Sequence, residues 1–120
     1  MPAFREFEMG AIRLMAAGIL TEAQLRAVQE ADKPCRYNYT GYYLTVAHAS
    51  LPTEQRTLSD PPVVGNAGEV QAGFVVFLGD QEVTLECHSW GVIDVPEDFR
   101  EQGVLVSTPP VIFLDLRNAT

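Results

Sequence analysis

The chain lacks the motifs that identify the common enzyme and cofactor-binding families. It has no glycine-rich phosphate loop, no Gly-x-Ser-x-Gly turn and no pair of cysteines at zinc-binding spacing. Its eight lysine and arginine residues form no basic patch with interleaved aromatic side chains, which nucleic-acid binding would require. We therefore expect no catalytic residue, no cofactor, no metal and no nucleic-acid partner.

Long apolar runs are also missing. Near the N-terminus, Glu6 and Glu8 interrupt the apolar residues before they resemble a signal peptide, and no stretch approaches membrane-spanning length. The two cysteines, Cys35 and Cys87, are compatible with a reducing compartment, and the sequence leaves open whether they ever pair. These features predict a cytoplasmic protein without a membrane partner.

The negative charge is concentrated in one stretch of the 120 residues. Between Glu54 and Glu101, ten acidic residues face only Arg56 and Arg100, and this difference equals the whole net charge of −8. Such a field repels nucleic acid and anionic membranes and favours a basic protein partner. The alternative is that the acidic residues serve only to keep the protein soluble.

The hydrophobic pattern predicts a single α+β domain over 1–120, helical in 1–33 and β-stranded in 34–120. Its two N-terminal helices would pack on a mainly antiparallel sheet of about five to six strands. The first helix would bury Phe4, Phe7, Ala11, Leu14 and Met15. The second would begin at a capping box formed by Thr21 and Gln24 and would bury Leu25 and Val28.

Strand-like segments alternate with turn residues after Pro34. The segment 51–60 is polar and is expected to be a loop, and Gly65-Asn66 is expected to form a turn. Pro96 to Phe99 resembles the start of a short helix anchored by Phe99. The expected strands are 36–39, 42–47, 63–64, 70–78, 81–88, 104–106 and 111–116.

The clearest expected element is a β-hairpin with Gly79-Asp80 as its two-residue turn. This turn would place Val76 opposite Val83 and Phe74 opposite Leu85. It would also place Gly73 opposite Glu86, which would leave that carboxylate uncovered. One face of the hairpin would then be apolar and the other largely polar.

Cys87 and His88 are types of residue that form nucleophile pairs, but neighbours in a strand point to opposite faces. Cys87 falls on the apolar face and is interpreted as a core residue. Glu86, His88 and Trp90 share the other face, where they could form a small pocket or a protein-binding surface. The alternative is a solvent-facing polar strand with Trp90 packed at its end. Two candidate ligands are too few for a zinc site.

Asp94, Glu97 and Asp98 bracket Pro96 and are interpreted as a solvated acidic loop, not as a catalytic carboxylate pair. The polar hairpin face and this acidic loop together form the predicted contact with a partner. Asp94, Glu97 and Asp98 lie at the rim of this contact. The predicted partner-binding residues are Glu82, Glu86, His88, Trp90, Asp94, Glu97 and Asp98.

Three segments carry a resemblance, namely 39–44 (Tyr-Thr-Gly-Tyr-Tyr-Leu), 73–78 (Gly-Phe-Val-Val-Phe-Leu) and 85–88 (Leu-Glu-Cys-His). Over about residues 39–99 the chain resembles a group of small uncharacterised bacterial proteins, from which it departs at Gly79-Asp80 and at His88. The resemblance implies a small fold of two helices and a sheet, and no activity. In size and charge the chain is similar to the immunity partners of bacterial toxins.

Three functional hypotheses follow from these observations. The first is a non-enzymatic immunity protein that neutralises a basic toxin domain such as a nuclease. The second is a small-molecule-binding or enzymatic domain with a pocket around Glu86 and His88. The third is a homo-oligomeric structural protein, and the sequence leaves the oligomeric state open.

Overall fold

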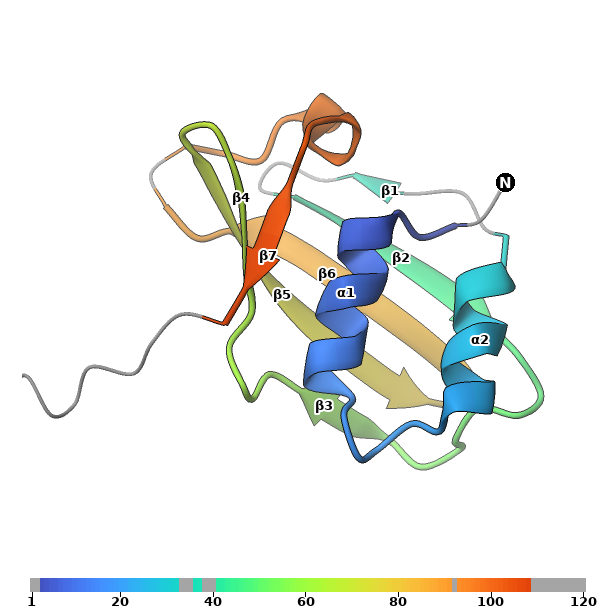
Figure 1. The fold of residues 1–120 in the computed structure, drawn as a ribbon. Coiled ribbons are helices and arrows are strands. Elements are labelled where there is room, and N and C mark those ends of the chain that lie inside the picture. Colours follow the sequence, from blue (N-terminus) through green and yellow to red (C-terminus); the bar gives the residue numbers. More distant parts are fainter. Residues whose placement is uncertain (1–2, 33–35, 38–40, 92, 109–120) are drawn as a thin grey trace, which may run out of the picture.

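A computed structural model describes residues 3–32, 36–37, 41–91 and 93–108, and for 36–37 the backbone alone. Two helices come first, and the remaining elements are strands and one short 3-10 helix (Figure 1). The elements are α1 (Glu6–Met15), α2 (Glu22–Glu30), β1 (Arg36–Tyr37), β2 (Gly41–Ala47), β3 (Arg56–Leu58), β4 (Val64–Ala67), β5 (Val70–Gly79), β6 (Glu82–Ser89), η1 (Glu97–Glu101) and β7 (Leu105–Ser107).

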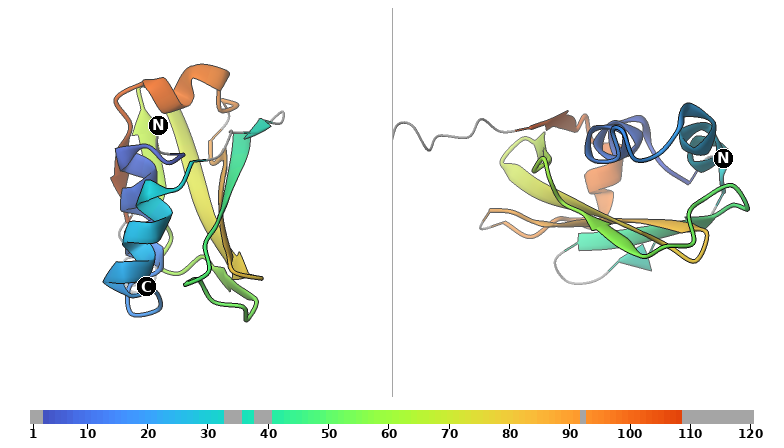
Figure 2. Two further views of the ribbon diagram at one scale, coloured as in Figure 1. Left: turned by 90° about the vertical axis from the view of Figure 1, so that its right-hand side faces the viewer. Right: turned by 90° about the horizontal axis from the view of Figure 1, so that it is seen from below.

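The strands form one antiparallel sheet. Six of them lie in the order β1-β2-β6-β5-β4-β7, and β3 adds a seventh by pairing with β5 beside β4. Both helices pack on the same side of this sheet, as the two turned views make plain (Figure 2). The predicted α+β class, with two N-terminal helices on an antiparallel sheet, is confirmed.

Helix α1 and the residues before it bury most of the stripe that we predicted, since Phe4, Ala11 and Met15 are buried and Phe7 packs against the core. Leu14 is 39% exposed, whereas Glu8 is fully buried together with Ala11, Ile12 and Met15. These four residues follow the i, i+3, i+4, i+7 spacing of one helical face. The prediction wrongly included Leu14 and omitted Ile12 and Glu8. Glu8 can be buried because it has an arginine partner inside the protein.

Helix α2 begins as predicted. The backbone N–H of Gln24 donates to the Thr21 hydroxyl (3.1 Å), and the backbone N–H of Thr21 donates to the Gln24 side chain (2.8 Å). This capping box satisfies two N–H groups that the first turn of a helix leaves without partners. Leu25 and Val28 are buried against the sheet, which confirms the predicted stripe.

The central hairpin has the predicted faces but not the predicted turn. Its two turn residues are Asp80 and Gln81, with φ of 53° and 59°, and Gly79 pairs with Glu82. Two successive positive φ values are typical of the type I′ turn that matches the twist of a hairpin. The backbone N–H groups of both turn residues also donate to loop carbonyls, Asp80 to Thr53 and Gln81 to Pro52.

This correction moves the register by two residues along β6. Val76 therefore lies opposite Leu85, and Phe74 lies opposite Cys87. A shift of two residues keeps every side chain on its original face, since side chains alternate with a period of two. All four of these residues are buried, so the predicted apolar face is confirmed although the pairing was wrong.

Outside the central hairpin, several predicted loops and turns were wrong, while the predicted anchor of the short helix was confirmed. The segment 51–60 contains β3, which was expected to be loop, because it finds a partner on β5. Gly65 and Asn66 lie within β4, and the chain turns instead at Gly68, whose φ is +61°. The expected strand 36–39 is described only as β1, and the expected strand 111–116 lies outside the described residues. Phe99 is buried in η1, as predicted.

One continuous core lies between the helices and the sheet. The aromatic rings of Phe7 and Phe99 meet edge to face there, with ring centroids 5.9 Å apart, and this contact joins α1 to η1. Within the described part of the chain, neither helix has the length and apolar character needed to cross a membrane.

Candidate functional site

The side of the sheet away from the helices is a candidate binding surface, because no described element covers it (Figure 2). Its residues are fixed by the strand registers. Tyr43, Glu86 and Val75 form one row across β2, β6 and β5. The next row toward the β5–β6 turn consists of Thr45, Thr84, Phe77 and Thr57. We call these rows, with Glu82, His88 and Trp90, the open face.

The open face exposes large aromatic side chains. Tyr43 is 40% exposed, Phe77 is 39% exposed and Trp90 is 50% exposed. Between them, the hydroxyls of Thr45 and Thr84 lie 2.8 Å apart and are hydrogen-bonded to each other. Aromatic residues are enriched at protein-binding interfaces and at their hot spots.

Glu86, His88 and Trp90 are neighbours on this face, as the alternation of the strand predicted. Nδ1 of His88 lies 3.6 Å from Oε1 of Glu86. A Cβ atom built at Gly73 would lie 2.7 Å from Nε2 of His88 and 2.5 Å from the Trp90 ring. Both side chains therefore cover Gly73, which explains why this strand position has no side chain of its own.

One detail of the predicted site is wrong. Gly73 lies opposite His88, and the residue opposite Glu86 on β5 is Val75. The cause is the two-residue change of register at the hairpin turn. Glu86 is nonetheless accessible, since its side chain is 41% exposed.

The acidic residues predicted at the rim are exposed, and two of them lie away from the open face. Glu97 and Asp98 lie on η1, which packs against α1 through Phe99 and so belongs to the helix-covered side. Asp94 lies in the exposed loop between β6 and η1, and Glu82 lies on the open face beside the β5–β6 turn. The structure thus places Glu82, Glu86, His88 and Trp90 on one face, and it places Glu97 and Asp98 on the helix-covered side.

A hollow of about 290 Å³ opens on the same face near the hairpin turn. Its lining includes Thr57, Phe77, Glu82 and Thr84, with Arg56 at the β3 edge. Glu86 and His88 do not line it, so the hollow is not the pocket that the second hypothesis requires. Within the described part of the chain, no three His, Cys, Asp or Glu residues gather closely enough to hold a metal ion.

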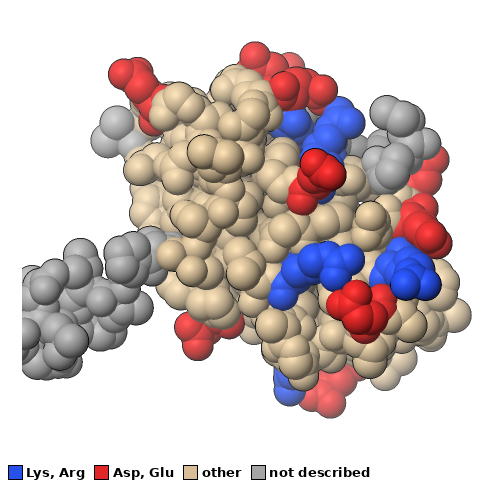
Figure 3. All heavy atoms as spheres, viewed as in Figure 1, with Lys and Arg blue, Asp and Glu red and all other residues tan. Residues whose placement is uncertain are grey.

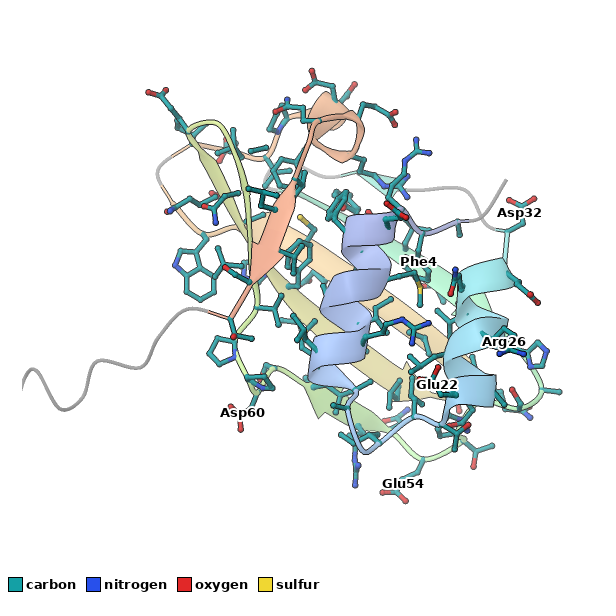
Figure 4. The ribbon with its side chains drawn as sticks, in the orientation of Figure 1. Phe4, Glu22, Arg26, Asp32, Glu54 and Asp60 are labelled. Carbon is teal, nitrogen blue, oxygen red and sulfur yellow. The ribbon has the colours of Figure 1, made fainter. Side chains whose placement is uncertain are left out.

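The helix-covered side has a different electrostatic character. Positive and negative side chains are interspersed around the two helices, and the half of this view nearer β4 and β7 carries few charges (Figure 3). Arg13 of α1 pairs with Glu22 of α2 at 3.3 Å, and Arg5 pairs with Glu101 of η1. Side-chain positions on this side, including Glu22 and Arg26, can be followed in Figure 4.

Sequence reasoning missed a buried polar cluster between α1, β2 and η1. The carboxylate of Glu8 accepts hydrogen bonds from Nε of Arg100 (2.7 Å), from Nη2 of Arg100 (2.8 Å) and from the Tyr42 hydroxyl. The Arg100 guanidinium also lies over the Tyr42 ring, 5.5 Å from its centroid. Glu8 is fully buried and the Arg100 side chain is only 10% exposed.

The charged and polar groups of this cluster find their hydrogen-bond partners within the protein, which indicates a structural role. Burial raises the pKa of Tyr42 well above its usual range, and the nearby Glu8 carboxylate raises it further. A bidentate arginine–carboxylate pair compensates the cost of burying both charges. The available sequence signal was the position of Glu8 among apolar residues on one helical face, together with an arginine directly after the anchoring Phe99.

Cys87 lies beside this cluster, opposite Tyr42 on β2 and Phe74 on β5. Its side chain is 1% exposed, which confirms the predicted core position. Its neighbour His88 points to the open face, so the two side chains lie on opposite sides of the sheet. Cys35 lies outside the described residues.

The open face is therefore the best-supported candidate site, and the buried cluster holds together the elements behind it. Comparisons with models of protein families, with curated proteins and with solved structures find nothing that matches this chain.

Proposed function

We propose that this protein is a non-enzymatic binding protein whose open face receives a basic protein partner. The observation that carries the proposal is an uncovered sheet surface on which Tyr43, Phe77 and Trp90 are exposed on the same face as Glu82 and Glu86. Aromatic anchors provide buried contact area, and the carboxylates select a cationic partner. An interface of about 800 Å² per partner is of the size that one face of a small sheet supplies.

The charge of the whole chain supports the same partner. The net charge of −8 belongs to the segment from Glu54 to Glu101. Arg100, one of the two arginines of that segment, is directed inward to Glu8 and adds little positive potential to the surface. A field of this sign accelerates the approach of a positively charged protein.

The most specific form of the proposal is an immunity protein that neutralises a basic bacterial toxin domain, such as a nuclease. Such an inhibitor must associate with the toxin before damage occurs, and an acidic surface increases the association rate. It also resembles the phosphate backbone that a nuclease cleft binds. The proposal includes a cytoplasmic location, where a nuclease would meet nucleic acid.

A second copy of the chain fits the open face less well. Two copies related by a two-fold axis through this face would bring Glu86 toward the Glu86 of the other copy. Like charges that face each other in a desolvated contact are unfavourable. This argument favours a partner of opposite charge over self-association.

The test is a binding titration with a basic toxin domain encoded beside the gene, at low and high salt. We expect Glu82→Lys to slow association and Trp90→Ala mainly to speed dissociation. Glu30→Lys provides a matched control, because it changes the charge equally on the exposed surface of α2, across the core from the open face. Charge reversal at Glu97 and Asp98 tests whether the acidic residues of η1 assist approach.

The proposal fails if the domain does not bind. It also fails if binding is insensitive to salt and to every substitution on the open face. The absence of a toxin-bearing reading frame beside the gene would remove the immunity interpretation and leave the broader one to be tested with other basic proteins.

A further inference from the structure

Glu86 occupies a central position on the open face. It lies on β6 with Tyr43 opposite it on β2 and Val75 opposite it on β5. Directly opposite residues in an antiparallel sheet have Cβ atoms about 5 Å apart, so all three side chains are in reach of one bound group. His88 follows on the same face of β6, and Trp90 packs beside His88 over Gly73.

The carboxylate of Glu86 differs from the other acidic groups that the structure places in contacts. Glu8, Glu22 and Glu101 each pair with an arginine of this chain. Within the described residues, no lysine or arginine pairs with Glu86, and its nearest recorded partner is His88 at 3.6 Å. That separation exceeds hydrogen-bonding distance, so the carboxylate oxygens of Glu86 are open to a donor from outside.

The surroundings of this carboxylate favour a planar cation. A guanidinium group donates two parallel hydrogen bonds to one carboxylate and stacks at the same time on an aromatic ring. Tyr43 and Trp90 present exposed rings on either side of the Glu86–His88 pair. A lysine ammonium is a compact, strongly hydrated charge and lacks both the fork geometry and the stacking surface.

We infer that Glu86, flanked by Tyr43 and by Trp90, is a binding site for an arginine side chain of the partner. Glu86 accepts the two guanidinium hydrogen bonds, and the aromatic rings shield them from water. The inference deepens the proposed function, on which it rests for the identity of the partner. The site itself is testable without that partner.

The experiment uses the full chain and a short blocked peptide, Gly-Arg-Gly, titrated to tens of millimolar and followed by amide and indole chemical shifts. Peptides with lysine or citrulline in place of arginine are the ligand controls. We expect the arginine peptide to shift the signals of Tyr43, Glu86 and Trp90. The lysine peptide should bind several-fold more weakly, and the uncharged citrulline peptide weaker still.

Three variants assign the effect to the site. Glu86→Gln should weaken binding about tenfold, since it removes a charge-assisted pair. Trp90→Ala should weaken it about threefold through the lost cation–π contact. Glu30→Gln is the matched control, because it makes the same change on the exposed surface of α2, across the core from the open face, and should leave the affinity within about twofold.

The inference is overturned if the arginine peptide causes no shifts at these residues, or if Glu86→Gln binds it as well as the original protein. It is also overturned if lysine binds equally well. These outcomes are separable from the proposed function. Tight binding of a basic domain that is unaffected by Glu86→Gln would refute this site alone, whereas Glu86-dependent arginine binding without any basic protein partner would refute the proposed function alone.

Discussion

The indole ring of Trp90 fills the space that a side chain at Gly73 would occupy, since a Cβ atom there would lie 2.5 Å from the ring. The contact joins the loop after β6 to the middle of β5. It fixes the exposed indole beside His88. Glu86 precedes His88 on the same face of β6, so the indole lies near the end of β6 on the open face. The geometry of the open face therefore depends on a glycine that carries no functional group.

Gly73→Ala should displace Trp90 without unfolding the protein. The atoms closest to the added methyl group belong to the side chains of His88 and Trp90, and these side chains can rotate away. We expect a red shift of tryptophan fluorescence and weaker binding at the open face. Gly103→Ala is the control, because a Cβ there meets nothing within 4 Å, and it should leave the fluorescence unchanged. An unchanged spectrum in Gly73→Ala would contradict the packing described.

Arg100→Met should lower the free energy of unfolding by about 3–5 kcal/mol, because it leaves the Glu8 carboxylate buried without its cation. Chemical denaturation measures this change. The exposed pair Arg13–Glu22 is the comparison, and Arg13→Met should cost no more than about 0.5 kcal/mol. Replacing Glu8 and Arg100 together by apolar residues should recover most of the loss, and failure to recover would argue against an uncompensated charge as its cause.

The stability of the protein should fall at alkaline pH through Tyr42. Burial raises the pKa of this hydroxyl in the folded state, while in the unfolded chain it titrates near pH 10. Above about pH 10 the unfolded state therefore releases a proton that the folded state retains, and the free energy of unfolding falls by about 1.4 kcal/mol per pH unit. Below that pH the contribution is fully present.

Tyr42→Phe removes this titration. Unfolding curves between about pH 8 and about pH 11 should show a shallower alkaline decline than in the original protein, by roughly one proton. The variant should also be less stable at neutral pH, since Glu8 loses one hydrogen-bond donor. Parallel alkaline slopes in the two proteins would show that Tyr42 ionises in the folded state.

Gly10→Ala should stabilise the protein by about 0.5–1 kcal/mol. Gly10 lies in the middle of α1, where alanine loses less backbone entropy on folding, and the added Cβ meets nothing within 4 Å. Gly18→Ala is a matched control with equally open space but with φ of +77°. It should instead destabilise the protein, since the left-handed conformation strains a residue with a side chain. Thermal melts of both variants decide the matter.

Thr21→Ala should cost about 1 kcal/mol, because the Gln24 backbone N–H loses the hydroxyl that accepts its hydrogen bond. Thr21→Ser retains the acceptor and should remain close to the original stability. A melting temperature unchanged by the alanine substitution would show that the cap contributes nothing to α2.

Local signals in the sequence were sufficient for several elements. The Thr21–Gln24 box marks the start of α2 because capping involves residues three positions apart, and alternation along β5 and β6 identifies the buried faces because the period of a strand is two. The same alternation brought Glu86, His88 and Trp90 together. The turn was misplaced because both Gly79-Asp80 and Asp80-Gln81 preserve that alternation, and only backbone conformation and loop contacts distinguish them.

The sequence by itself determined the α+β class, the concentration of negative charge between Glu54 and Glu101 and the residues that share each strand face. The tertiary structure decided which side of the sheet the helices cover, and hence that Tyr43, Phe77 and Glu86 lie on an open face. It also decided that Glu8 is buried, because its partner Arg100 is 92 residues away along the chain. Contacts at such separation depend on the packing of α1 against η1, which no local pattern encodes.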